Sequence, residues 1–149
     1  MPSVPGLRSC YDKTGRLVYF GRMLDKIRLQ AAGRLPADYV GNLGKGFDAR
    51  CCSFLGVDYP TLKDRVLQGG TNEEILAWGH ERGGPRTDDQ CLLWNCFLMK
   101  RGWRDDVTAT LRERIVQYGL VGKPIETFFD LNEYDEGRDP VGTQAWTKG

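Results

Sequence analysis

The sequence predicts a single compact all-α domain of about seven helices. Apolar residues recur mainly at intervals of three and four, whereas the alternation of apolar and polar residues that is typical of half-buried strands is scarce. The chain of 149 residues is long enough to bury one hydrophobic core, and it contains no repeat and no linker long enough to divide two domains. We therefore expect one helical domain over residues 1–149, with an N-terminal arm at 1–15 and a flexible tail at 136–149.

The first third of the chain contains two predicted helices separated by a glycine-rich loop. The first helix covers residues 17–33, because Gly33 and the nearby Pro36 end the helical pattern. The residues GNLGKG at 41–46 form a loop, since their glycines disfavour regular structure. A short helix follows over 47–56, where FDARCCSFLG places its apolar residues on one side.

The next three predicted helices are each preceded by a side chain that caps free backbone N–H groups. Asp58 is placed to cap the helix that begins with YPTL. Thr71 with Glu74, and Thr87 with Gln90, form two capping boxes, in which the hydroxyl and the residue three positions later satisfy backbone N–H groups reciprocally. These caps predict that a helix starts immediately after each capping residue.

The C-terminal half of the chain is predicted to contain the central helix of the fold. The helix that follows the second capping box is apolar nearly all round, so we expect it to run through the centre. Gly83 and Gly102 stand where a left-handed residue ends a helix. Residues 105–118 form a further helix with Tyr118 on its buried stripe, and a last short helix opens at Pro124.

The apolar face of the first helix is interrupted by two charged residues, Asp25 and Arg28. They fall on a narrow strip between two apolar halves of the helix, where an isolated buried charge would cost several kcal/mol. The two residues stand one turn apart and can pair. The pair either ties this helix to a neighbour or lines a polar pocket, and both interpretations stay open. The outward polar face of the helix is predicted elsewhere, at Tyr19, Arg22, Lys26 and Gln30.

Four further residues carry candidate chemistry. Lys45 and Arg50 flank a helix start that follows a glycine-rich loop, where free N–H groups can hold an anion; an ordinary turn is the alternative, because the spacing does not match a phosphate-binding loop. Asp48 is either a first-turn acid stabilised by the helix dipole or a second carboxylate facing Asp25. Asn95 is the lone polar residue in CLLWNCFLM, and it either braces a neighbouring loop or reaches into a pocket.

The overall composition argues against several classes of protein. The 21 Lys and Arg residues are balanced by 20 Asp and Glu residues and alternate with them, whereas a nucleic-acid-binding protein gathers a basic excess on one face. No apolar run is long enough for a signal peptide or a membrane span. The odd number of cysteines, the absence of a CxxC motif and the single histidine argue against disulfides and metal sites. We therefore expect a cytoplasmic protein without a metal or other cofactor and without a nucleic-acid or membrane partner.

Three segments of the chain resemble a bacterial family that is known only as a domain of unknown function. The segments are LDKIR, which contains Asp25 and Arg28; FDAR followed by FLGVD, which contains Asp48 and Arg50; and FFDL near the C-terminus. The likeness extends over roughly residues 7 to 137. It implies a small cytosolic protein, and it implies no activity, cofactor or partner.

These observations predict a site for an anionic small molecule between the helix at 17–33 and the loop and helix at 41–55, with acid/base chemistry at the same place. The predicted site residues are two catalytic carboxylates, Asp25 and Asp48, and four ligand-binding side chains, Arg28, Lys45, Arg50 and Asn95. The alternative is a non-catalytic interaction or structural module, such as a homodimer. In that module exposed Trp103 or Tyr134 and the C-terminal tail would make the contacts.

Overall fold

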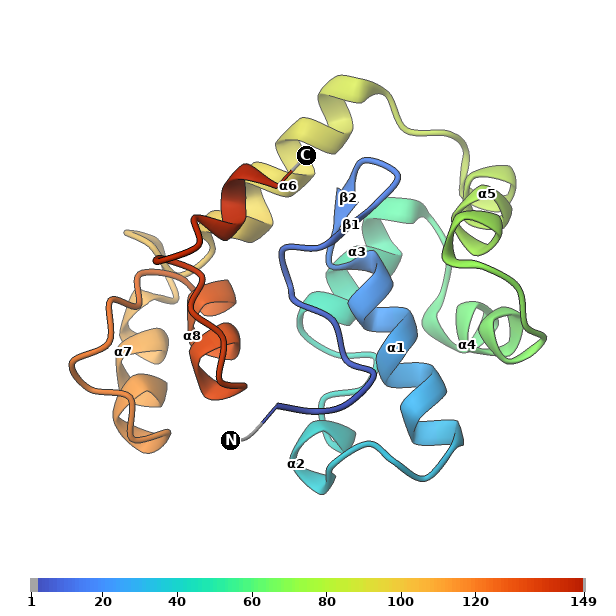
Figure 1. Cartoon of the computed structure of the whole chain (residues 1–149). Coiled ribbons are helices and arrows are strands. Elements are labelled where there is room, and N and C mark those ends of the chain that lie inside the picture. Colours follow the sequence, from blue (N-terminus) through green and yellow to red (C-terminus); the bar gives the residue numbers. More distant parts are fainter. Residues whose placement is uncertain (1–2, 149) are drawn as a thin grey trace.

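The computed structural model describes residues 3–148, which form eight α-helices, one 3₁₀ helix and a small β-hairpin (Figure 1). The mostly helical fold is therefore confirmed, and the hairpin is an addition that the sequence did not predict. Its two antiparallel strands have two residues each, too few for an alternating pattern to be recognised. The elements in chain order are β1 (Lys13–Thr14), β2 (Leu17–Val18), α1 (Phe20–Ala31), α2 (Ala37–Val40), α3 (Phe47–Leu55), α4 (Tyr59–Leu67), α5 (Asn72–Gly83), α6 (Asp88–Lys100), α7 (Thr108–Gln117), α8 (Phe128–Asp135) and η1 (Ala145–Thr147).

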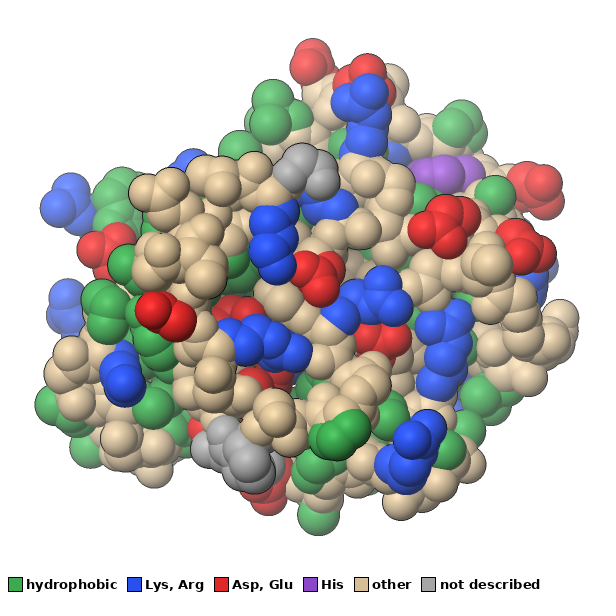
Figure 2. Space-filling model, viewed as in Figure 1, with side chains coloured by type: hydrophobic (Ala, Val, Ile, Leu, Met, Phe, Trp, Pro, Cys, Tyr) green, Lys and Arg blue, Asp and Glu red, His purple; other side chains and the backbone are tan. Residues whose placement is uncertain are grey.

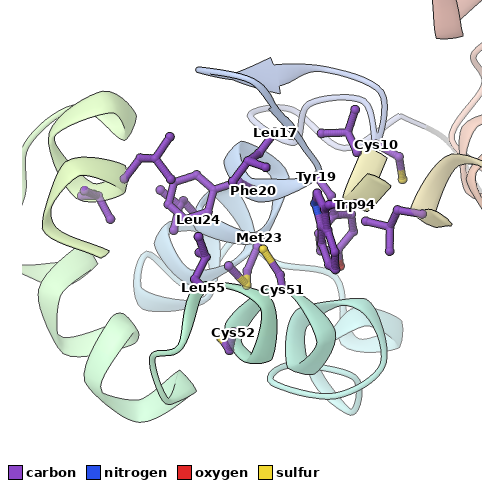
Figure 3. Packing of buried hydrophobic residues seen from close by; sticks show 14 of the residues in the cluster. Cys10, Leu17, Tyr19, Phe20, Met23, Leu24, Cys51, Cys52, Leu55 and Trp94 are labelled. Carbon is purple, nitrogen blue, oxygen red and sulfur yellow. The ribbon is translucent and has the colours of Figure 1, made fainter. Parts of the chain in front are cut away.

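The central helix of the fold is α1. Nine of its 12 residues are buried, and it packs against α4 and the hairpin. Figure 3 shows Phe20, Met23 and Leu24 of α1 in the same apolar cluster as Cys51 and Leu55 of α3. The helix begins later than predicted because the residues just before it pair in the hairpin instead.

The prediction that α6 runs through the centre of the fold is wrong. This helix packs on β2 and α8 with one face only and lies along the upper left edge of the molecule in Figure 1. The buried face consists of Cys91, Trp94, Asn95 and Leu98. The exposed face includes Leu92, Leu93 and Phe97. Apolar residues all round a helix allow burial on every side, but burial also requires neighbours on every side, and here α1 occupies the centre.

The capping predictions are confirmed. The carboxylate of Asp58 accepts a hydrogen bond from the backbone N–H of Thr61, at 2.9 Å. Both capping boxes are formed, at Thr71 and at Thr87. These signals are reliable because each cap satisfies its partners within a few residues of the same segment.

Three details at helix ends differ from the predictions. Gly83 is the last residue of α5, and the residue with a positive φ is the following Gly84, at +91°. At Gly102, in contrast, the predicted positive φ is present, at +100°. Tyr118, expected on a buried stripe, is exposed. The last helix starts after Thr127, whose hydroxyl accepts a hydrogen bond from the Asp130 N–H, and not at the preceding proline.

Both ends of the chain contribute to the core. In the N-terminal arm, Cys10 and Tyr11 belong to the main apolar cluster. In the C-terminal segment, which was expected to be a flexible tail, Glu136 is buried, and Ala145 of the short helix η1 belongs to the main apolar cluster. This packing brings residues from the two ends of the chain next to α1.

Candidate functional site

A cleft of about 730 Å³ opens between α1, the segment from α2 to α3, and the pair α7 and α8. The wall formed by α1 and the residue before it consists of Tyr19, Arg22 and Lys26. Facing it are side chains of α7, α8 and the loop before α3. The helices that meet here are far apart in the sequence, so the cleft exists only in the folded chain.

Positively charged side chains outnumber negatively charged ones in this cleft. Six cationic residues line it: Arg22, Lys26, Lys45, Arg50, Arg101 and Arg114. Three acidic residues line it: Asp38, Asp135 and Glu136. The excess is local, because Figure 2 shows basic and acidic side chains interspersed over the face of the molecule that it displays.

A buried ion pair between Arg22 and Glu136 joins α1 to the end of α8. The guanidinium donates to both carboxylate oxygens, at 2.8 and 2.5 Å. The Tyr39 hydroxyl donates to the same carboxylate at 2.8 Å, and Arg138 donates at 2.6 Å. Burial by itself raises the pKa of Glu136, but hydrogen bonds and charge from Arg22, with the bonds from Tyr39 and Arg138, outweigh it and hold that pKa below the usual value. Glu136 therefore stays ionised at neutral pH.

Tyr19, Lys26 and Asp48 form a second buried polar cluster at the cleft. The Tyr19 hydroxyl donates to Asp48 Oδ1 at 2.7 Å, and Lys26 Nζ donates to the Tyr19 hydroxyl at 2.9 Å. Lys26 Nζ also lies 2.8 Å from Asp48 Oδ1. Burial, followed by the negative charge of Asp48, raises the pKa of Tyr19 well above its ordinary value, so its hydroxyl is protonated at neutral pH.

Asp48 connects this cluster to the glycine-rich loop before α3. Its second carboxylate oxygen accepts a hydrogen bond from the Gly44 N–H at 3.0 Å. Gly44 has φ +74°, a conformation that glycine adopts without strain. Asp48 is fully buried, so it holds the loop, the lysine and the tyrosine in place without itself lining the cleft.

The backbone at Tyr19 has an unusual conformation for a residue with a side chain. Its φ is +73°, in the left-handed region. Tyr19 lies between the last residue of β2 and the first residue of α1, so the chain changes direction at this residue. A left-handed backbone at a residue other than glycine costs on the order of 1–3 kcal/mol. Such strain is concentrated at functional sites, and here it occurs at a residue that lines the cleft.

Three of the cationic side chains in the cleft, Lys45, Arg50 and Arg114, form no ion pair within residues 3–148. Arg50 lies over the ring of Phe97, with its guanidinium carbon 5.2 Å from the ring centroid, and Arg114 lies 5.7 Å from the centroid of Phe128. Aromatic rings hold these guanidinium groups in place without neutralising their charge.

The structure separates the predicted site residues into two groups. Lys45 and Arg50 line the cleft, and Asp48 lies directly behind it. Asp25 and Arg28 do not line it. They lie on a different face of α1 from Tyr19, Arg22 and Lys26, because the helix turns by about 100° per residue.

Asp25 and Arg28 have other partners. Asp25 Oδ2 accepts hydrogen bonds from the Arg8 side chain at 2.7 Å and from the Arg8 backbone N–H at 3.0 Å. Arg28 lies 3.9 Å from Asp25 and donates to the Asn72 side chain at 2.7 Å. The main partner of Asp25 is thus an arginine of the N-terminal arm, which no helical pattern could indicate.

Asn95 braces the hairpin, which was one of its two predicted roles. Its Oδ1 accepts a hydrogen bond from the Val18 N–H at 3.0 Å, and its Nδ2 donates to the Arg16 carbonyl at 2.6 Å. It does not line the cleft.

The most important correction concerns the face of α1 that was expected to point outward. Tyr19, Arg22 and Lys26 are buried, and they line the cleft. A polar helical face can be covered by water or by another part of the protein, and its sequence is the same in both cases. Sequence reasoning also missed Arg114 and Glu136, which no local motif indicates.

Two negative findings apply to the part of the chain that the structure describes. No group of three or more His, Cys, Asp or Glu side chains between residues 3 and 148 is arranged to hold a metal ion. None of the helices in that range combines the length and the apolar character that crossing a bilayer requires.

Comparison with known proteins assigns the chain to a family. None of the curated proteins matches the sequence. One family model, described as a domain of unknown function (DUF5069), matches residues 4–138, a range that includes every residue of the cleft. The protein therefore belongs to the DUF5069 family, for which no function is assigned.

Proposed function

We propose that the cleft between α1, α3, α7 and α8 binds a small anionic molecule. The observation that carries the proposal is the convergence of Lys45, Arg50 and Arg114 on one cleft without an ion-pair partner in residues 3–148. Like charges gathered in a concave site repel one another, and a bound anion removes that repulsion. The two arginines lie over aromatic rings, so less of their freedom is lost when they bind a ligand.

The walls and size of the cleft support a small organic anion. Its volume of about 730 Å³ lies within the range of ordinary ligand pockets. Five aromatic side chains contribute to its lining: Tyr19, Tyr39, Phe47, Tyr118 and Phe128. These rings would contact the uncharged part of the ligand, while the cationic side chains bind its carboxylate or phosphate group.

Within this proposal, Tyr19 and Lys26 are the buried polar groups of the cleft wall that would act on the ligand. Burial and the charge of Asp48 raise the pKa of Tyr19 and keep its hydroxyl protonated at neutral pH, so Tyr19 would act through hydrogen bonds, and Lys26 next to it would stabilise negative charge on the ligand. Asp48 acts as a positioning residue, because it contacts both groups from behind. Asp25 takes no part, since it lies outside the cleft.

Thermal denaturation of the purified protein with a panel of carboxylates, phosphates and sugar acids tests the proposal. A ligand at 100 times its dissociation constant stabilises the folded state by about 2.7 kcal/mol. For a domain of this size, that corresponds to a rise in melting temperature of roughly 5–11 °C. Sodium chloride at matched ionic strength controls for general salt effects. If no anion in the panel raises the melting temperature above this control, the proposal is wrong.

A pair of variants on α7 locates the binding site. Arg114→Gln removes a cationic side chain from the cleft, and Arg112→Gln removes one from the same helix outside the cleft. We expect the first variant to weaken binding of the stabilising anion by roughly tenfold or more, measured by titration calorimetry, and the second to leave it unchanged. Equal effects of the two variants would place the anion elsewhere.

A further inference from the structure

The outer face of α6 is apolar and uncovered, although its inner face already contributes to the core. Leu92 and Leu93 are 59% and 70% exposed. At 100° per residue, Leu93 lies with Asp89, Cys96 and Lys100 on one narrow stripe opposite the buried face of the same helix, and Leu92 flanks this stripe. A monomer gains nothing from a second apolar stripe in water, so the stripe points to a partner.

The sequence of this stripe is complementary to itself in the antiparallel orientation. If a second copy of α6 packs in reverse direction about the midpoint of the stripe, positions equidistant from that midpoint face each other. The resulting pairs along the stripe are Asp89 with Lys100 and Leu93 with Cys96. Each pair occurs twice in a symmetric dimer, so the contact contains an apolar centre and an ion pair at each end.

The charged residues at the ends of the stripe are free to form these pairs. Neither Asp89 nor Lys100 makes an ion pair with another residue of the chain in the described range of 3–148, and both are exposed. Asp89 lies in the first turn of α6 and Lys100 in the last turn. An antiparallel partner therefore brings acid next to base at both ends, whereas a parallel partner would bring like charges together.

We propose that α6 is the interface of a symmetric homodimer in which the two copies of the helix pack antiparallel. The partner that covers this face is a second copy of this chain. In the antiparallel orientation the acid at one end of the stripe meets the base at the other end of the second copy, so no other protein is needed to complement the charges. A helix of 13 residues is about 20 Å long, so the contact is small and the dimer forms in a concentration-dependent way. The dimer does not depend on ligand binding in the cleft.

Sedimentation velocity of the full chain over a concentration series tests the dimer. We expect a reversible shift from monomer to dimer as the concentration rises. Leu93→Glu should raise the dissociation constant by roughly tenfold or more, while leaving the melting temperature of the monomer unchanged, because the side chain is exposed. The matched control is Leu67→Glu, which changes an exposed leucine on α4 and should leave the dimer intact. A strict monomer at every soluble concentration, or a dimer that Leu93→Glu does not weaken, would overturn the proposal.

A charge exchange tests the antiparallel orientation. Asp89→Lys and Lys100→Asp should each weaken the dimer, because each brings like charges together at both ends. The double variant should restore the dissociation constant to within a few-fold of the original, since it exchanges the partners without changing their number. A double variant that is as weak as either single variant would show that these residues do not face each other.

A cysteine at position 93 gives an independent readout. In the proposed dimer, Leu93→Cys places a new thiol opposite the native Cys96 of the second copy. Mild oxidation should then produce a covalent dimer on a non-reducing gel, and the additional change Cys96→Ser should abolish it. A covalent dimer that persists without Cys96 would contradict the proposed pairing.

Discussion

The substitution Glu136→Gln tests whether the buried ion pair beside the cleft holds α8 to α1. The side chains of Arg22 and Glu136 are only 4% and 2% exposed, and the guanidinium donates to both carboxylate oxygens. Glutamine keeps the size of the side chain and removes its charge. The Arg22 guanidinium is then left buried beside a neutral amide.

The expected cost follows from this geometry. Removing one partner of a buried ion pair lowers the free energy of unfolding by about 3–5 kcal/mol, because the remaining charge stays uncompensated. In a domain of about 150 residues, each kcal/mol corresponds to roughly 2–4 °C in melting temperature. We therefore expect Glu136→Gln to lower the melting temperature by about 6–20 °C.

Circular dichroism and urea denaturation measure this loss, and two further variants make it interpretable. Glu113→Gln, on the exposed surface of α7, should change the free energy of unfolding by less than about 0.5 kcal/mol. The double variant Arg22→Met with Glu136→Leu removes both charges and should cost less than the sum of its single substitutions. If Glu136→Gln melts like the original protein, or if the effects of Arg22→Met and Glu136→Leu simply add, the two side chains do not stabilise the fold as a buried ion pair.

The same carboxylate predicts how stability depends on pH. The pKa of Glu136 in the folded protein lies below its value of 4.5 in the unfolded chain, so its contribution is fully present above pH 4.5. That contribution is lost as the pH falls through the lower, folded-state pKa. The original protein should therefore lose more stability than Glu136→Gln when urea denaturation is repeated at successively lower pH below 4.5. Parallel pH profiles for the two proteins would refute this assignment.

Three further predictions concern packing and hydrogen bonds away from the cleft, and thermal denaturation measures each of them. Gly83→Ala should destabilise the protein by about 1–3 kcal/mol, because the added methyl group would overlap a backbone carbonyl of α3. Gly79→Ala, in the same helix with open space around it, should stabilise the protein by about 1 kcal/mol. The opposite order of the two stabilities would contradict this prediction. Asn95→Leu should cost about 1–3 kcal/mol, because it leaves a hairpin N–H and a carbonyl without partners, and a neutral result would show that water replaces the amide. Asp25→Asn should lower the free energy of unfolding by about 1.5–3 kcal/mol, because it weakens charge-assisted hydrogen bonds in a buried position. Arg28→Leu should lower it by less than about 1 kcal/mol, because that side chain is 35% exposed. Equal losses would contradict the assigned partners.

Features that depend on neighbouring residues in the chain could be predicted from the sequence. The cap at Asp58 and the capping boxes at Thr71 and Thr87 occur where they were predicted, because a cap satisfies N–H groups two or three residues away. The two-residue strands of the hairpin were not predictable in this way. Their pairing depends on Asn95, which reaches them from a helix far along the chain.

The cleft depends on contacts between distant segments. The sequence marked Lys45, Asp48 and Arg50 as candidates because a glycine-rich loop before a helix is a local feature. It could not assign Arg22 to the same cleft, because a cationic residue on a polar helical face looks the same whether water or protein covers it. The burial of that residue is decided by Glu136, more than 100 positions away, to which it is hydrogen bonded.

The local sequence by itself thus determined which of the longer segments are helical, where several of them begin, and that a charged loop precedes α3, whereas the four-residue helix α2 was not predicted. Only the tertiary structure decided that α1 and not α6 is central, and which polar face of α1 is enclosed. The physical reason is the range of the interactions. Capping and helical periodicity act over a few residues of one segment, whereas burial depends on which other segments occupy the space around a helix.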